Sequence, residues 1–441
     1  MQTSTRNDML LARSVASVWH PCTQMKQHET LPLIPIAYAK DCWLYDCDGR
    51  RYLDAVSSWW VNLLGHANPR INAALADQLS RLEHVMLAGF THEPVVALSE
   101  RLSRLTGGAL GHCFYASDGA SATEIALKMS FHYWRNTGRP DKTEYVSLAG
   151  SYHGETLGAL SVTDVALFKD TYAPLLRAST QVPSPDWRLA NEGESPRELA
   201  ARCARALEAH LAAHHQRIAA FIVEPLVQGA TGMAMYDAHY LELVRTLCDR
   251  YEVHLIADEI MTGFGRTGTF FAHEQAGITP DFLCLSKGIT GGYLPLSVVL
   301  TRDSIYDAFY DDQVTRGFLH SHSYTGNALA CRAALATLDI FEADDVIASN
   351  RARASAMNVK ASALARHPRV RNFRNTGMIW AFEVANDDAA IGRRIYEAAL
   401  AREILLRPIG ATVYFMPPYT MTEDEQSLLV ERSLEIVESL C

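Results

Sequence analysis

Short apolar runs alternate with helical patterns through the middle of this 441-residue chain, and this alternation restricts the fold more than any other feature. Polar residues or glycines bound the runs, as they bound buried strands. The runs are 112–116, 145–148, 219–223, 254–257, 282–285 and 297–300, and the helical patterns are 120–134, 196–214 and 241–250. Strands and helices in alternation predict a mostly parallel sheet covered by helices on both faces.

The two ends of the chain have a different pattern. Residues 43–46 and 51–54 predict a hairpin that turns at Asp48-Gly49, a dipeptide typical of tight turns. A long helix is expected to begin near Asn327, and further strands are expected at 379–384 and 412–415. We therefore expect an α/β fold, with an N-terminal segment (1–68) that joins a small α+β domain (337–441), and a large domain between them (69–336). Residues 183–196, rich in Pro, Ser and Asn, indicate a surface loop.

Charge and composition favour a small-molecule substrate. The net charge is −10 with no block of like charge, which argues against a nucleic-acid partner. No apolar stretch approaches the roughly 18 residues of a membrane span, and the first residues do not resemble a secretory signal. The nine cysteines are scattered without a Cys-x-x-Cys pair, as expected for reduced thiols in the cytoplasm. His320 and His322 have no other ligand at metal-site spacing, so we expect no metal.

A lysine lies directly after the expected strand 282–285. Lys287, in Ser286-Lys287-Gly288, should emerge at the carboxyl end of a buried strand, where open α/β sheets bind ligands. Loss of hydration there lowers the pKa of an amine and makes it a nucleophile toward an aldehyde. The alternative is a surface lysine at a strand end, which the tripeptide alone does not exclude.

Two other features follow expected strands in the same way. Asp258 comes directly after strand 254–257, and an aspartate in such a place can keep a pyridine nitrogen protonated, although it can also cap a helix. The turn at 117–121 places Gly119 and Ala120 at a helix start, where free amides bind phosphate. With Lys287, these features favour a site for pyridoxal phosphate.

Residues 256–268 and 285–288 resemble the class III aminotransferases, which have the pyridoxal-phosphate fold type I. Within that class the chain is similar, over nearly its whole length, to the diaminopelargonic acid aminotransferases of biotin synthesis. The strings that carry this closer resemblance are His20-Pro21, Ser57-Ser58-Trp59-Trp60, Tyr152-His153-Gly154, Arg407-Pro408 and Met416-Pro417-Pro418-Tyr419. The resemblance implies pyridoxal 5′-phosphate as cofactor, 8-amino-7-oxononanoate and S-adenosylmethionine as substrates, and a homodimer with shared active sites.

The resemblance also assigns roles to single residues. Lys287 would hold the coenzyme aldehyde as an imine and move the substrate proton, while Asp258 would hold the pyridine nitrogen. The other cofactor residues implied are Gly119, Ala120, Tyr152 and His322, together with Ser323 from the neighbouring subunit. The substrate residues implied are Cys22, Trp59, Trp60, Tyr152, Ser321, Arg407 and Tyr414. Without the resemblance, the tandem tryptophans would be interpreted as core residues and Arg407 as a surface charge.

Three positions depart from the family pattern. Cys22 stands where a tyrosine usually follows His-Pro, Glu155 where an aspartate is common, and Ser321-His322 where Gly-Pro is usual. The loss of an aromatic face at Cys22 leaves lysine open as an alternative donor, because a ring there would contact a sulfonium or an adenine. A general ω-aminotransferase and a coenzyme-binding protein without catalysis also stay open. The pair Trp59-Trp60 favours S-adenosylmethionine, which is the donor we expect.

Overall fold

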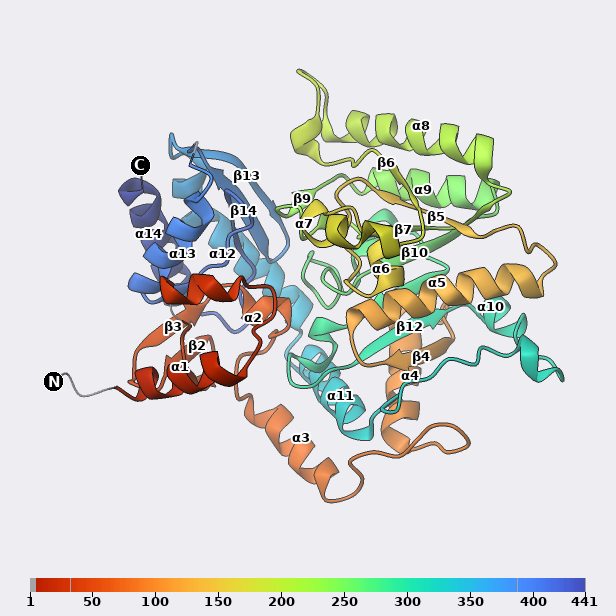
Figure 1. Cartoon of the computed structure of the whole chain (residues 1–441), viewed down its shortest axis with the longest axis horizontal. Helices are drawn as coiled ribbons and strands as arrows, with labels where there is room; N and C mark the ends of the chain where they lie inside the picture. Colours follow the sequence, from red (N-terminus) through yellow and green to blue (C-terminus); the bar gives the residue numbers. More distant parts are fainter. Residues whose placement is uncertain (1–4, 32, 387, 441) are drawn as a thin grey trace.

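The computed structural model describes residues 5–31, 33–386 and 388–440. Its largest sheet has seven strands in the order β4-β12-β11-β10-β7-β5-β6 (Figure 1). Their bounds are β4 His112–Ala116, β5 Glu144–Leu148, β6 Thr180–Val182, β7 Ile218–Val223, β10 His254–Asp258, β11 Phe282–Leu285 and β12 Ser297–Thr301. Only β12 is antiparallel to its neighbours, which confirms the mostly parallel sheet. The carboxyl ends of β5, β7, β10 and β11 therefore lie at one edge.

Helices cover both faces of this sheet. The side chains of the central strands point alternately to the two faces, and they are apolar on both. Ile222 and Ile256 pack with α5 (Gly119–Asn136), whereas Phe221 and Leu255 pack with α8 (Pro196–His214) and α9 (His239–Arg250). All residues of β7, β10 and β11 are buried. The sheet thus provides a rigid base for side chains that follow its strands.

The C-terminal part forms a second, three-stranded antiparallel sheet. It contains β13 (Val370–Thr376), β14 (Ile379–Val384) and β16 (Thr412–Phe415) in the order β13-β14-β16. Its helices are α12 (Val346–Ala365), α13 (Ile391–Ala401) and α14 (Glu423–Ser439). The expected strands β14 and β16 are confirmed, while β13, whose sequence VRNFRNT is largely polar, was not expected.

The N-terminal segment joins this part through a four-stranded sheet. The expected hairpin is present as β2 (Trp43–Asp46) and β3 (Arg51–Asp54), with β1 (Ile36–Lys40) beside β2. Strand β15 (Ile404–Leu405) pairs in parallel with β3. Figure 1 accordingly shows the N-terminal strands beside the C-terminal helices.

The remaining elements connect these parts. Helix α11 (Ala328–Ala343), capped by Asn327 as expected, runs continuously through the boundary that we placed between residues 336 and 337, and the division into domains stays a prediction. The other helices are α1 Arg6–Ser17, α2 Ser57–Trp60, α3 Pro69–Leu79, α4 Glu93–Leu105, α6 Leu157–Val162, α7 Ala166–Lys169 and α10 Asp303–Asp307. The 3-10 turns are η1 Met25–Glu29, η2 Asp170–Leu175, η3 Trp187–Leu189, η4 Ala272–Ala276, η5 Lys287–Thr290 and η6 Val314–Arg316, and strands β8 (Val227–Gln228) and β9 (Ala234–Met235) form a small hairpin. Within the described ranges, no helix is both long and apolar enough to cross a bilayer.

Candidate active site

Lys287 lies directly after the carboxyl end of β11 and is half-buried. The residue begins η5 and has a positive φ of 44°, a conformation in which a side chain is strained. Its Nζ lies 5.1 Å from the ring centroid of Trp60. Burial lowers the pKa of the amine, while the charges of Asp258 and Glu224 oppose that shift. The amine therefore faces an aromatic wall in a space with little water.

Asp258 ends β10, the strand beside β11. Its Oδ2 accepts a hydrogen bond of 2.7 Å from His153 Nδ1, and its Oδ1 accepts one from the amide of Ile260 at 3.1 Å. The side chains are 4% and 0% exposed for Asp258 and His153, so the pair is shielded from water. Among the described residues, His153 Nε2 has no hydrogen-bond partner. His153 thus fixes the orientation of the Asp258 carboxylate, and this contact was not predicted from the sequence.

The start of α5 leaves two backbone amides available. The side chain of Asp118 accepts from Ser121 N at 2.9 Å, and its carbonyl accepts from Ala122 N at 3.1 Å. Those bonds leave the amides of Gly119 and Ala120, the predicted phosphate donors, at the positive end of the helix. A Cβ at Gly119 would lie 2.9 Å from the Ile260 side chain, so glycine is needed for this helix to pack against the segment that follows β10.

Tyr152 lies in the loop after β5, half-buried beside Phe168. Its hydroxyl donates to Glu155 at 2.8 Å, and its amide donates to Glu224 Oε1 at 2.9 Å. Glu224 was not predicted as a site residue. Its position was a usable signal, because it directly follows the apolar run 219–223 at the same sheet edge as Lys287.

The tandem tryptophans are presented by a left-handed turn. Residues Ser57, Ser58, Trp59 and Trp60 have φ values of 51°, 46°, 71° and 73°, and none of them is glycine. A left-handed residue other than glycine costs about 1–2 kcal/mol, so this turn needs support from its surroundings. Ser58 Oγ donates to Asp54 at 2.8 Å, and Ser57 Oγ donates to the carbonyl of Met416 at 2.7 Å.

This turn brings both tryptophans to predicted substrate residues. Trp60 Nε1 donates to the hydroxyl of Tyr414 on β16 at 3.1 Å. The guanidinium of Arg407, two residues beyond β15, lies 4.5 Å from the ring centroid of Trp59. Lys287, Trp60 and Tyr414 thus form one group, and Trp59 with Arg407 forms a neighbouring one.

Cys22 reaches the same region from the N-terminal segment. The residue is exposed and has a positive φ of 51°. Partial burial raises the pKa of its thiol, the Glu155 charge raises it further, and the Arg407 charge lowers it. Cys22 therefore lies near the predicted substrate arginine, as expected, and provides no ring at that point.

Residues 321–323 lie in the segment between η6 and α11, away from this group. The imidazole Nε2 atoms of His320 and His322 are 3.2 Å apart, and the carbonyl of Ser323 accepts from His84 at 2.8 Å. Within the described part of the chain, no hydrogen bond or ion pair connects Ser321, His322 or Ser323 to Lys287 or Asp258. The roles of these three residues, including the contact of Ser323 with a neighbouring subunit, stay predictions.

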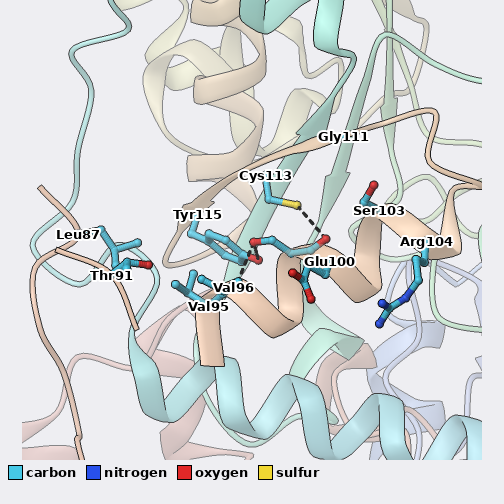
Figure 2. A pocket seen from close by; sticks show the side chains of 11 residues that line it. Leu87, Thr91, Val95, Val96, Glu100, Ser103, Arg104, Gly111, Cys113 and Tyr115 are labelled. Atoms are coloured by element: carbon cyan, nitrogen blue, oxygen red, sulfur yellow. Dashed lines mark hydrogen bonds between the residues drawn. The ribbon is translucent and has the colours of Figure 1, made fainter. Parts of the chain in front are cut away.

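A separate cavity of about 550 Å³ lies between α4 and β4 (Figure 2). Tyr115 and Cys113 face it from β4, and the Tyr115 hydroxyl is hydrogen-bonded to Ser99 Oγ at 2.8 Å. None of the predicted site residues lines this cavity. We place the candidate active site at Lys287, because the charged and aromatic groups suited to chemistry gather there.

Comparison with known sequences identifies the family of the chain. The profile of the class-III aminotransferases matches residues 24–437. The chain belongs to this family, which confirms the resemblance and the aminotransferase class predicted from the sequence.

Individual relatives are more specific. The chain is 47% identical to the adenosylmethionine-8-amino-7-oxononanoate aminotransferase of Helicobacter pylori, over 98% of each chain. It is 39% identical to the protein of the same name from Geobacter sulfurreducens, over 94% of each chain.

Solved structures agree with the predicted fold class. The crystal structure of the adenosylmethionine-8-amino-7-oxononanoate aminotransferase of Methanocaldococcus jannaschii has a TM-score of 0.92 and 33% identity, and covers 98% of this chain and 99% of its own. A PLP-bound amine transaminase from an uncultivated Pseudomonas species has a TM-score of 0.90 and 34% identity, over 96% and 99%. The predicted fold of the class is thereby confirmed.

Proposed function

We propose that this chain is a pyridoxal 5′-phosphate-dependent aminotransferase of biotin synthesis that transfers the amino group of S-adenosylmethionine to 8-amino-7-oxononanoate. The proposal rests on one group of residues: Lys287, Trp60, Tyr414, Trp59 and Arg407. This group combines an amine beside an aromatic ring, flat apolar surface and one guanidinium. The names of the Helicobacter and Methanocaldococcus relatives support the same reaction.

The residues at the sheet edge fit pyridoxal phosphate by their chemistry. Lys287 offers an amine of lowered pKa for the aldehyde, and Asp258, oriented by His153, offers a carboxylate for the pyridine nitrogen. The free amides of Gly119 and Ala120 suit the phosphate. When bound, the coenzyme supplies an electron sink for a carbanion at the substrate carbon.

The chain's own residues would perform the proton transfer. Burial lowers the pKa of the Lys287 amine, which favours the neutral form of Nζ that can take a proton and return it. The Trp60 ring over Nζ excludes water from that atom. Tyr152, held by Glu224 and Glu155, would lie on the coenzyme ring.

Arg407 would bind the distant carboxylate of the keto acid. A guanidinium can bind a carboxylate through two parallel hydrogen bonds, and the Trp59 ring on which it lies keeps its planar fork oriented. The aliphatic chain of the acceptor would contact Trp59 and Trp60. A general amine substrate would not need this arginine.

The experiment is a set of single-turnover reactions on the purified holoenzyme. S-adenosylmethionine and lysine, each at saturating concentration, are added separately, and loss of the coenzyme absorbance near 420 nm is followed. The pyridoxamine form is then mixed with 8-amino-7-oxononanoate. We expect rapid conversion by S-adenosylmethionine and recovery by the keto acid. If lysine converts the coenzyme and S-adenosylmethionine does not, lysine is the donor. If the keto acid does not restore the absorbance, the proposed acceptor is wrong.

We further propose that the enzyme acts as a homodimer in which Ser323 and His322 complete the partner's phosphate site. This proposal is supported by the exposure of Ser323 and by the absence, among the described residues, of a hydrogen bond from Ser323 or His322 to Lys287. A hydroxyl and an imidazole are both able to donate to a phosphate oxygen.

A further inference from the structure

Glu224 is a buried carboxyl group that takes no part in the proposed proton transfer. It directly follows β7 and is 5% exposed. Its two oxygens accept from different loops: Oε1 from the amide of Tyr152 at 2.9 Å, and Oε2 from the amide of Gly229 at 3.0 Å. One side chain therefore connects two loops that do not follow each other in the sequence.

Each of these loops contacts one aromatic residue of the site. The first loop carries Tyr152 itself. The second passes directly beneath Trp60, because a Cβ at Gly229 would lie 3.2 Å from Trp60 Cη2. Trp60 in turn covers Nζ of Lys287. A shift of either loop would move an aromatic side chain relative to the lysine amine.

Resting on the function proposed above, we propose that Glu224 is a positioning residue. Its carboxylate connects the Tyr152 loop to the Gly229 turn through two hydrogen bonds, which we call the tie. The tie holds the side chains of Tyr152 and Trp60 in fixed positions around Lys287. Two hydrogen bonds from backbone amides to one carboxylate fix both loops at once. The tie requires both carboxylate oxygens as acceptors.

The surroundings make this tie sensitive to pH. The charges of Asp258, His153 and Lys287 act on Glu224, and the Tyr236 hydroxyl donates to the backbone carbonyl of Glu224. Burial, reinforced by the Asp258 charge and opposed by His153, raises the pKa of Glu224 to about 7. A protonated carboxyl group presents an O–H to one of the two amides, so the tie weakens as the pH falls through about 7.

The first test is amide hydrogen exchange on the holoenzyme without substrate. In the wild type, after correction for intrinsic rates, peptides that contain Tyr152 and Gly229 should both be protected several-fold more at pH 8 than at pH 6. In Glu224→Gln, the side chain has one acceptor oxygen at every pH, so the extra protection should be lost in both peptides. Equal protection at the two pH values in the wild type would overturn the proposal, even if the variant does not fold.

The second test is kinetic, with the keto acid that the wild type converts. We expect Glu224→Gln to raise KM about tenfold, as loss of one charged hydrogen bond predicts, to change kcat less than threefold, and to remove the rise of KM below pH 7. Glu124→Gln is the matched control, since Glu124 also accepts from two amides, those of Gly158 and Ala159, and should keep the wild-type profile. Wild-type KM in Glu224→Gln would contradict the tie. Failure of the proposed substrates would leave the exchange result unchanged, since that measurement uses none.

Discussion

Nζ of Lys287 lies beside the Trp60 ring, and burial lowers the pKa of this amine. We expect Lys287→Ala to fold and to lose turnover by at least about 10²–10⁴-fold, the usual contribution of proton transfer. Mass spectrometry after borohydride treatment should find no coenzyme attached to the variant. Lys40→Ala, at an exposed lysine of β1, is the control and should retain both properties. Turnover near the wild-type level in Lys287→Ala would refute the assignment.

Substitutions of Asp258 and of Arg407 should impair different steps of the reaction. Asp258→Asn removes the charge that His153 orients, and should slow both half-reactions. Arg407→Ala should weaken binding of the keto acid by about 2–5 kcal/mol if the pair is shielded from water, with little effect on the donor half-reaction. Single-turnover kinetics of each half-reaction, with Arg407→Lys as the variant that keeps the charge but loses the planar fork, separate the two roles. Equal slowing of both halves by both variants would contradict them.

Among single residues, the sequence predicts the position of those that directly follow an apolar run. Lys287 and Asp258 could be predicted because each follows a buried strand, and the strand alone determines where it emerges. The contacts of His153 and Glu224 could not be predicted, because they depend on which strands are neighbours, although the position of Glu224 directly after the run 219–223 was a usable signal. β7 lies between β5 and β10, and this order places Glu224 between the loop of His153 and the side chain of Asp258.

Among the elements, the left-handed turn at Ser57–Trp60 allows an unusual stability test. In a right-handed helix, glycine is less stable than alanine by about 1 kcal/mol. At Ser58, with φ 46°, a Cβ is strained, so the order should reverse: Ser58→Gly and Ser58→Ala both lose the bond to Asp54, but the glycine variant should be more stable by about 1 kcal/mol.

Urea unfolding midpoints of the two variants measure this difference. Ser362, within the right-handed helix α12, is the matched control at which alanine should be the more stable replacement. If Ser58→Ala is as stable as Ser58→Gly, the turn is not strained in solution.

Strands buried along their whole length were predicted well, whereas the partly exposed β13 and the turn at Ser57–Trp60 were not. The apolar residues of β7, β10 and β11 determine buried strands without ambiguity. The sequence of β13 alternates too few apolar residues to predict a strand, and it forms one because β14 provides its partner. Likewise, Ser57–Trp60 contains no glycine, so nothing in the sequence indicates a left-handed turn.

For the whole molecule, the proposed shared site can be tested by mixing inactive variants. Lys287→Ala lacks the amine, and Ser323→Glu would place a negative charge against the partner's phosphate. If each site takes Lys287 from one subunit and Ser323 from the other, a mixed dimer has one intact site. Refolding the two variants together should therefore restore roughly a quarter of wild-type activity, since random pairing makes half of the dimers mixed.

Each variant refolded alone serves as the control and should stay inactive. Coenzyme affinity, measured by absorbance titration, should recover in the mixture in the same proportion. Activity of Ser323→Glu alone at the wild-type level would remove Ser323 from the phosphate site, and no recovery on mixing would contradict sharing between subunits.

The pairing of β3 with β15 has a consequence for how the chain folds during its synthesis. Leu53 pairs with Ile404, which the ribosome adds 351 residues later (404 − 53). At roughly 5–20 residues per second, the edge of β3 waits about 20–70 seconds for its partner strand. Trp59 and Trp60 come shortly after β3, and the left-handed turn that carries them cannot be supported by Met416 until residue 416 has been synthesised. The substrate pocket can thus form only after the parallel sheet that carries Lys287 has left the ribosome.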